Sequence, residues 1–194
     1  REASLRLLAP ISKHRLKLTG ARNINLLAEL YPDIDDFWLP FPQIQELHGA
    51  SHHHQEGVHF AVLGHKLHPF YGTYAPNRTS HLELFGTWLS QYKGPRNHAT
   101  DVGTGCGVLA YMLSRAGFSE VLATDNNPNA IESVLRDLKR SPAPIQAVQG
   151  DLLEPCETTD LIVFNPPWIQ GERATPLDDA LYFGDDFFDL FDKA

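Results

Sequence analysis

Cysteine is scarce in this chain, and long apolar runs are missing. The 194 residues include two cysteines, Cys106 and Cys156, which argues against a disulfide framework and favours a reducing compartment such as the cytoplasm. No apolar run approaches the roughly 20 residues that a membrane-spanning helix needs, and no secretory signal opens the chain. The sequence therefore predicts a cytoplasmic protein without a membrane partner.

Positive charge is also in short supply. The chain has 16 Lys and Arg against 24 Asp and Glu, a net charge of −8, which argues against indiscriminate binding to nucleic acid. Residues 1–98 nevertheless hold ten basic against eight acidic residues, whereas residues 99–194 hold six against sixteen. The first 22 residues interleave six basic residues with leucines, and this pattern predicts a basic amphipathic helix. That helix is either a nucleic-acid contact or a solvated face.

A glycine-rich turn follows a short apolar stretch that is typical of a buried strand. The segment Thr100–Ala110 carries three alternating glycines and leads into an apolar helical pattern that Gly117 is expected to end. Glycine lets the backbone approach a ligand closely, and a helix N-terminus favours an anionic group. A dinucleotide fingerprint would need glycine at position 108, where the chain has Val108. A dehydrogenase is therefore the weakest alternative.

Two further strands are expected after this turn, and each leads to a carboxylate. Val121–Asp125 is the second strand, and Ile145–Val148, followed by Asp151, is the third. The helix between them shows apolar residues at helical spacing after an Asn-Asn-Pro start. Because ligands bind at the carboxyl ends of strands in open α/β sheets, these acids are expected to meet one ligand. Asp125 is expected to accept hydrogen bonds from ribose hydroxyls.

The run Leu161–Phe164 predicts a fourth buried strand, which stops at Asn165-Pro166-Pro167-Trp168. Two prolines prevent both a helix and further strand pairing, so the chain must leave the sheet in an extended shape. This corner displays an amide side chain, a carbonyl group and an aromatic ring. It suits the recognition of a flat, NH2-bearing group, although Asn-Pro-Pro alone is also compatible with a structural turn.

Residues 99–169 resemble the class I S-adenosylmethionine-dependent methyltransferases that carry Asn-Pro-Pro followed by an aromatic residue. That subgroup includes release-factor glutamine, adenine-N6 and ribosomal RNA guanine-N2 methyltransferases. The resemblance implies S-adenosylmethionine as cofactor, bound by Asp101, Gly103, Gly105, Gly107, Asp125, Asn126, Asp151, Leu152 and Asn165. It implies a catalytic corner of Asn165, Pro166 and Trp168, with substrate contacts from Pro167, Trp168 and Arg78. Tryptophan at 168 departs from the commoner tyrosine.

The chemistry of this corner favours methyl transfer to a planar nitrogen. Such a nitrogen is a poor nucleophile because its lone pair is conjugated. Hydrogen bonds from its two N–H groups to the Asn165 side-chain oxygen and the Pro166 carbonyl would hold it and favour pyramidalisation, so positioning supplies most of the acceleration. The expected acceptor is an exocyclic base amine of RNA, preferred for the basic N-terminal segment, or a protein glutamine. A catalytically inactive cofactor-binding scaffold or activator subunit is the alternative function.

The expected fold class is α/β, a doubly wound Rossmann-like methyltransferase sheet with strand order 3-2-1-4. A small α+β appendage is expected at residues 1–75 and the cofactor-binding domain at residues 76–194. Such a sheet needs about three more strands after the Asn-Pro-Pro corner, yet twenty-six residues follow Trp168. We therefore expect a truncated domain whose C-terminal strands are missing and whose fourth strand lies at an exposed edge.

The segment that joins these regions has weaker signals. Pro32–Pro42 predicts a turn-rich linker, and the histidines of His48–His54 predict a polar surface loop with no metal site. Val58–Leu63 and Leu67–Tyr74 predict the two strands of a hairpin. Pro76, Arg78 and Thr79 loosely match a segment that closes over the cofactor in the resembled family.

Overall fold

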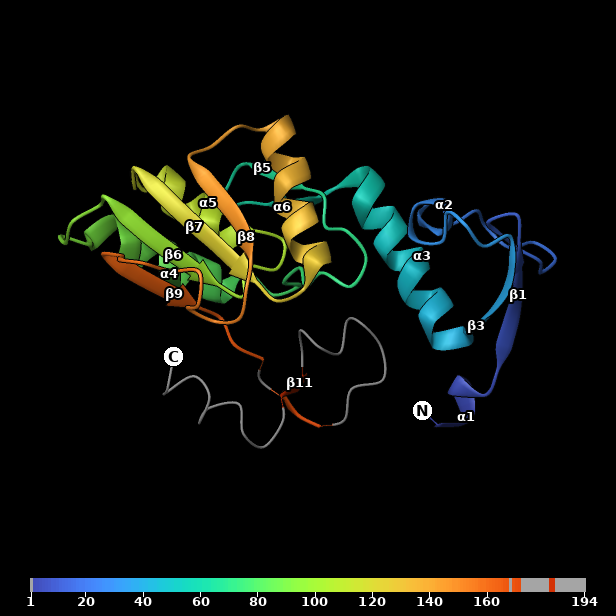
Figure 1. Cartoon of the computed structure of the whole chain (residues 1–194). Helices are drawn as coiled ribbons and strands as arrows, with labels where there is room; N and C mark the ends of the chain where they lie inside the picture. The colour runs from blue at the N-terminus through green and yellow to red at the C-terminus, as the bar shows by residue number, and fades with distance from the viewer. Residues whose placement is uncertain (1, 168, 172–181, 184–194) are drawn as a thin grey trace. The chain divides into compact units, whose positions relative to one another are not determined.

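The computed structural model describes residues 2–167, 169–171, 182 and 183. The chain forms two compact units, residues 1–56 and residues 57–194 (Figure 1). The first unit contains α1 (Glu2–Leu5), β1 (Leu8–Ser12), β2 (Arg15–Leu16), α2 (Leu26–Leu30), β3 (Asp36–Pro40) and α3 (Phe41–Glu56). The second contains β4 (Val58–Phe60), β5 (His65–Leu67), α4 (Ser80–Gln91), β6 (His98–Val102), α5 (Val108–Arg115), β7 (Glu120–Asp125), α6 (Pro128–Arg140), β8 (Ile145–Gln149), β9 (Leu161–Phe164), β10 (Ile169–Gln170) and β11 (Tyr182–Phe183).

The first unit is a three-stranded antiparallel sheet with the order β2-β1-β3. Its buried core includes Ala9 and Ile11 from β1, Leu39 from β3, and Ile44 and Leu47 from α3. Ala9 pairs with Leu39, so these side chains lie on the same face of the sheet. Along β1, buried residues alternate with residues of the opposite face, of which Leu8 is exposed and Pro10 and Ser12 are half-buried.

The basic amphipathic helix expected in the first 22 residues is wrong. The helix α1 ends at Leu5, and the chain then forms the hairpin of β1 and β2. The two residues of its turn, Lys13 and His14, both have positive φ (49° and 56°), as the tight hairpin turns that match strand twist require. Neither residue is glycine or asparagine, so the usual sequence signal of such a turn is absent at these two positions.

Two expectations for residues 32–54 are also wrong. Residues 36–40 form β3, which pairs with β1 along five residues, rather than a linker. The histidines lie on the sixteen-residue helix α3 rather than in a loop. Ile44, Leu47 and Ser51 are its buried residues, a three- and four-residue spacing that fits one helix face. His48 and His52 are therefore separated by one helical turn, but the described residues contain no group of three or more metal-binding side chains.

The second unit contains a four-stranded parallel sheet with the order β8-β7-β6-β9, which confirms the expected 3-2-1-4 order. Figure 1 shows these strands side by side with the helices α5 and α6 beside them. The helix α5 packs against β6 and β7, and α6 packs against β7 and β8. Buried residues of both elements form one core, including Val108, Leu113, Val121, Ala123 and Val134.

The helix α5 ends as the sequence predicted. Gly117 has a φ of 93° and donates its N–H to Ser114 O, while Phe118 donates its N–H to Leu113 O. These two bonds form a Schellman motif, which satisfies the last carbonyl groups of the helix. Phe118 and Leu113 are both buried in the core of the second unit, so the motif also anchors the start of the next strand.

The expected hairpin of residues 58–74 is present but shorter. Val58–Phe60 pairs with His65–Leu67 as the antiparallel strands β4 and β5, and residues 68–76 continue without strand structure. Side chains of α6 hold this continuation by hydrogen bonds. The compact units accordingly divide after Glu56, whereas the sequence placed a boundary after residue 75.

The strand β9 pairs with β6 on one side, and β9 is the last strand of the four-stranded sheet on that side. Its residue Ile162 is 44% exposed. In the described part of the chain, no helix combines the length and apolar character that would let it cross a membrane. Trp168 of the predicted corner lies outside the described residues.

Candidate functional site

The carboxyl ends of three neighbouring strands meet at one level of the parallel sheet. Val102 of β6 pairs with Thr124 of β7 and with Phe164 of β9. The next residues along the three strands are Gly103, Asp125 and Asn165, so the acid and the amide lie on either side of the first glycine of the turn. The structure therefore brings three of the predicted site residues to the same edge of the sheet, where ligands of open α/β sheets bind.

The turn Gly103–Gly107 needs glycine at each of its three alternating positions. Gly103, Gly105 and Gly107 have φ of 62°, 53° and 85°, a region that side-chain-bearing residues rarely adopt. A Cβ at Gly105 would lie 2.9 Å from Tyr74 O, and one at Gly103 would lie 3.2 Å from the Phe164 ring. The turn is thus a tight backbone cradle that leads directly into the N-terminus of α5.

The Asp101 side chain accepts hydrogen bonds from the cradle and from the helix that follows it. Its Oδ2 accepts hydrogen bonds from Thr104 Oγ1 at 2.6 Å and from Ala110 N at 3.0 Å. Burial raises the pKa of the Asp101 carboxyl to about 7, although these two hydrogen bonds act in the opposite direction. Its Oδ1 is buried and has no hydrogen-bond partner among the described residues. A buried carboxylate oxygen without a partner is costly, so a cationic or N–H group of a ligand would suit it.

Asp125 connects the cradle to the second strand and to α6. Its Oδ2 accepts from Gly105 N at 2.9 Å, and its Oδ1 accepts from Asn127 N at 2.9 Å. Burial raises the pKa of the Asp125 carboxyl, opposed by these two backbone hydrogen bonds. Each oxygen keeps lone-pair capacity for a further donor. The carboxylate is therefore fixed in place and can still accept hydrogen bonds from hydroxyl groups.

The other residues predicted around the cofactor lie next to the end of β7. Asn126 follows Asp125 and is exposed, and its carbonyl accepts from the Gln149 side chain at 3.2 Å. Asp151 is exposed in the turn after β8. Leu152 has a positive φ of 44°, and its carbonyl accepts from Thr124 Oγ1 at 3.1 Å. The structure thus places Asn126 and Leu152 against β7 and leaves the Asp151 side chain open to solvent.

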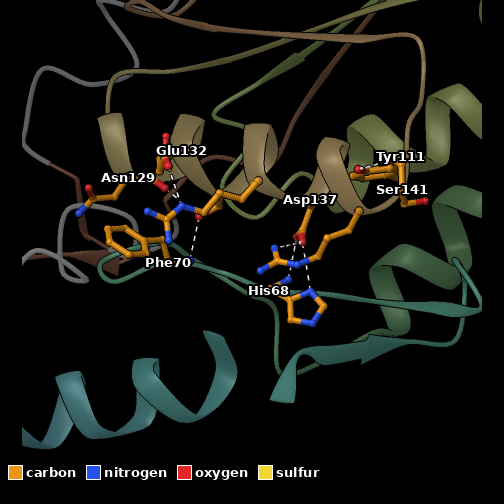
Figure 2. Close-up of polar contacts among 10 residues, drawn as sticks. His68, Phe70, Tyr111, Asn129, Glu132, Asp137 and Ser141 are labelled. Atoms are coloured by element: carbon orange, nitrogen blue, oxygen red, sulfur yellow. Dashed lines mark hydrogen bonds and ion pairs between the residues drawn. The ribbon is translucent and has the colours of Figure 1, made fainter. Parts of the chain in front are cut away.

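The segment 68–76, which we call the strap, runs along α6 and ends over the glycine turn. His68 N donates to Asp137 Oδ2 at 2.7 Å, and Phe70 N donates to Ser133 Oγ at 2.8 Å. Figure 2 shows these contacts, with Asn129 and Asp137 on α6 and Phe70 on the strap. Asn129 Nδ2 donates to the carbonyl of Tyr71 at 2.9 Å.

The far end of the strap touches the glycine turn itself. Asn127 Nδ2 donates to Gly72 O at 2.8 Å, and Cys106 N donates to Tyr74 O at 3.1 Å. Asn127 also caps α6, because its side-chain oxygen accepts from Asn129 N. One side chain thereby links the strap, the start of α6 and, through its backbone N–H, Asp125.

Sequence reasoning missed the polar residues that hold the strap. Asn129, Ser133 and Asp137 recur at intervals of four along α6, and Ser133 and Asp137 are 0% and 2% exposed. Polar residues repeated at helical spacing beside an apolar stripe indicate a second buried face. That signal was available in the sequence, whereas the identity of the partner segment was not.

The structure locates the remaining site residues less closely. Asn165, Pro166 and Pro167 follow β9 and are half-buried, while Trp168 lies outside the described residues. Pro76 is buried at the end of the strap, and Arg78 is exposed before α4. Pro76 is therefore the last residue of the strap, whereas Arg78 lies two residues beyond it.

Comparison with known proteins places this site in a family context. Residues 83–180, about half of the chain, match the model of the methyltransferase small domain family. The chain is 40% identical over 80 residues to the ribosomal protein L11 methyltransferase of Pelotomaculum thermopropionicum, a match covering 40% of this chain and 26% of that protein. It is 34% identical over 97 residues to the release factor glutamine methyltransferase of Bacillus subtilis, which covers 47% of this chain and 34% of that protein.

A solved structure also shows similarity. The 16S rRNA methyltransferase of T. thermophilus, in complex with AdoMet and guanosine, aligns with a TM-score of 0.48 and 22% sequence identity. The alignment covers 60% of this chain and 34% of that chain. The chain thus spans well under half the length of the curated relatives named above.

Proposed function

Because the chain belongs to the methyltransferase small domain family, we propose that it transfers a methyl group from S-adenosylmethionine to a planar nitrogen. The observation that carries the proposal is the common level of Gly103, Asp125 and Asn165 at the carboxyl edge of the sheet. A cradle, an acceptor for hydroxyl groups and an amide corner lie there side by side. The Asn-Pro-Pro corner separates this site from a generic nucleotide pocket.

The residues of the cradle fit the predicted cofactor. The alternating glycines let a ligand approach the backbone closely. The Asp101 oxygen without a partner suits the ammonium group of the methionine moiety, and Asp125 suits the ribose hydroxyls. Asp151 and Leu152 would flank the adenine, and Asn126 lies beside Asp125 at the same end of β7. When bound, S-adenosylmethionine supplies an electrophilic methyl group.

The role of Asn165 and Pro166 is to hold the acceptor nitrogen. The Asn165 side-chain oxygen and the Pro166 carbonyl each accept one N–H of an NH2 group, which orients the nitrogen and weakens its conjugation. The methyl group would pass to the nitrogen as its bond to the cofactor sulfur breaks, S-adenosylhomocysteine would leave, and the proton that the methylated nitrogen loses would pass to water. Neither Asn165 nor Pro166 needs to change its protonation state, so catalysis rests on orientation and on hydrogen bonding that strengthens in the transition state. Trp168, Pro167 and Arg78 are proposed to contact the rest of the acceptor.

The acceptor is proposed to be an exocyclic base amine of RNA, with a protein glutamine as the second candidate. Both present a planar NH2 group, so the corner alone does not distinguish them. Both cysteines are free, which supports the cytoplasm as the compartment. An inactive scaffold or activator subunit is the competing function, and the intact Asn-Pro-Pro corner favours the enzyme.

The test separates cofactor binding from transfer. Asn165→Ala should abolish transfer of labelled methyl groups to fractionated RNA and protein, because the nitrogen loses its acceptor. The affinity for S-adenosylhomocysteine, measured by calorimetry, should fall far less than the transfer rate, because Asn165 is one of several residues expected to contact the cofactor. Asn23→Ala, an exposed asparagine of the first unit, is the matched control and should change neither quantity. Wild-type turnover in Asn165→Ala would remove the proposed role. A wild-type protein that binds the cofactor but methylates no fraction would favour the scaffold.

A further inference from the structure

The outer face of the sheet in the first unit exposes an aromatic side chain. Trp38 of β3 is 62% exposed, although its neighbour Leu39 is 6% exposed and faces the core. Trp38 pairs with Pro10 of β1, and Leu8 pairs with Pro40 one step further along the same face. Leu8 is 55% exposed. Exposed large apolar side chains gathered on one sheet face mark an interaction surface.

A cation continues the row that contains Trp38. The register of β1 and β2 pairs Ile11 with Leu16, and Lys17 donates its N–H to Pro10 O at 2.9 Å. Lys17 is therefore opposite Pro10, and the row across the three strands reads Lys17, Pro10, Trp38. Because side chains opposite one another project to the same face, the lysine and the tryptophan share the outer face.

The next row places a second cation on that face. Arg15 pairs with Ser12, which pairs with Asp36. All three are on the outer face, and Arg15 and Asp36 occupy opposite edges of the sheet. The face thus carries two cations along the β2 edge and one acid, Asp36, at the start of β3. Trp38 lies on β3, so β1 separates its ring from the two cations. Lys13, in the hairpin turn, adds a further positive charge at the β2 end.

We propose that this outer face binds single-stranded RNA. A sheet face that carries an exposed aromatic ring on one edge strand and Arg and Lys on the other is a combination with which proteins bind single-stranded nucleic acids. A base stacks on the ring, and the phosphates follow the cations. A base stacks on Trp38 and the backbone runs along the β2 edge past Lys17 and Arg15. The inference gives the proposed function its acceptor class, and the choice of RNA over DNA rests on that function.

Binding is tested directly, without methyl transfer. The full chain is titrated into a fluorescein-labelled twelve-nucleotide uridine RNA, and anisotropy is followed at several salt concentrations. Trp38→Ala should weaken binding about tenfold or more through loss of stacking. Trp88→Ala removes a comparably exposed tryptophan (46%) of the second unit and should change affinity by less than about twofold. Trp38→Phe, which keeps a ring, should retain most of the affinity.

The salt dependence supplies an independent readout. Lys17→Gln and Arg15→Gln should each lower the slope of log affinity against log salt by about 0.7, as expected for one lost phosphate contact on a single strand. Absence of RNA binding at low salt, or an equal loss in Trp88→Ala, would overturn the proposal. If Trp38→Ala instead lowers methylation of a protein fraction while no RNA binds, the face docks protein. A failure here leaves the Asn165 test unaffected, since that test needs only the second unit's site.

Discussion

Asp101 illustrates how one residue can serve the fold and the site at once. One of its carboxylate oxygens accepts hydrogen bonds from Thr104 in the turn and from Ala110 in α5, and the other has no partner among the described residues. The sequence pattern predicted that this acid lies at the site but not that it is completely buried. Burial depends on the strands and helices around it, which local spacing does not encode.

The buried acid should make stability depend on pH. The pKa of Asp101 is about 7 in the folded chain and about 4 when unfolded, so the folded state binds more protons between these values. The free energy of unfolding should therefore fall as pH rises through this window, by on the order of 3 kcal/mol between pH 5 and pH 8. Asp101→Asn, which keeps the shape of the side chain, should remove most of this decline in urea unfolding.

An acid with the opposite shift provides the control. Hydrogen bonds from the backbone of His98 and Asn97 lower the pKa of the exposed Asp160. This carboxyl is ionised in both folded and unfolded chains above pH 5, so Asp160→Asn should change stability equally at pH 5 and pH 8. A decline with pH that is unchanged in Asp101→Asn would contradict the assignment.

Helices and strands were predictable where their ends carried signals. The strands β6 to β9 are followed by glycine, Asn-Pro or Asn-Pro-Pro signals, and the predicted bounds of β7, β8 and β9 agree with the structure within one residue. The first unit lacked such signals. Pro40 ends β3 and Pro42 lies in the first turn of α3, positions that both tolerate proline. Closely spaced prolines also occur in linkers. The sequence therefore does not distinguish a linker from a strand end followed by a helix start.

Substitution by alanine should change stability in opposite directions at two glycines, one just after α5 and one inside α3. Gly117 ends α5 with a φ of 93° and has no atom within 4 Å of an added Cβ. Gly117→Ala should therefore destabilise the chain by about 1 kcal/mol through backbone strain alone. Gly49, inside α3, is equally open and has no positive φ, so Gly49→Ala should stabilise by about 0.5–1 kcal/mol. Chemical unfolding of both variants checks the pair, and a shift of the same sign in both would contradict it.

At the scale of the whole molecule, the parallel sheet and its glycine turn could be predicted. For the first unit, the α+β class was expected, but its hairpin, its third strand and its long helix were not. The parallel order follows from strands that all end at polar residues on one edge, a pattern spread over the 65 residues from Asp101 to Asn165. The boundary between the units lies before the strap because the strap is hydrogen-bonded to α6 of the second unit, and such contacts between distant segments are not visible in local sequence patterns. Asn165 and Arg78 remain predictions as functional residues, and Trp168 lies outside the described part.

The hydrogen bond between Cys106 N and Tyr74 O gives the chain an internal reporter. Cys106 is 1% exposed, and burial raises the pKa of its thiol to about 12, so the closed form should resist alkylation. In a Cys156→Ser variant, iodoacetamide should react with Cys106 only while the hydrogen bond from Cys106 N to Tyr74 O is broken and the strap has moved off the turn. The labelling rate then measures how often the strap opens, and bound S-adenosylhomocysteine should lower this rate. If the Cys106 thiol reacted as fast as free cysteine, the form in which the strap contacts the turn would be only a small fraction of the population.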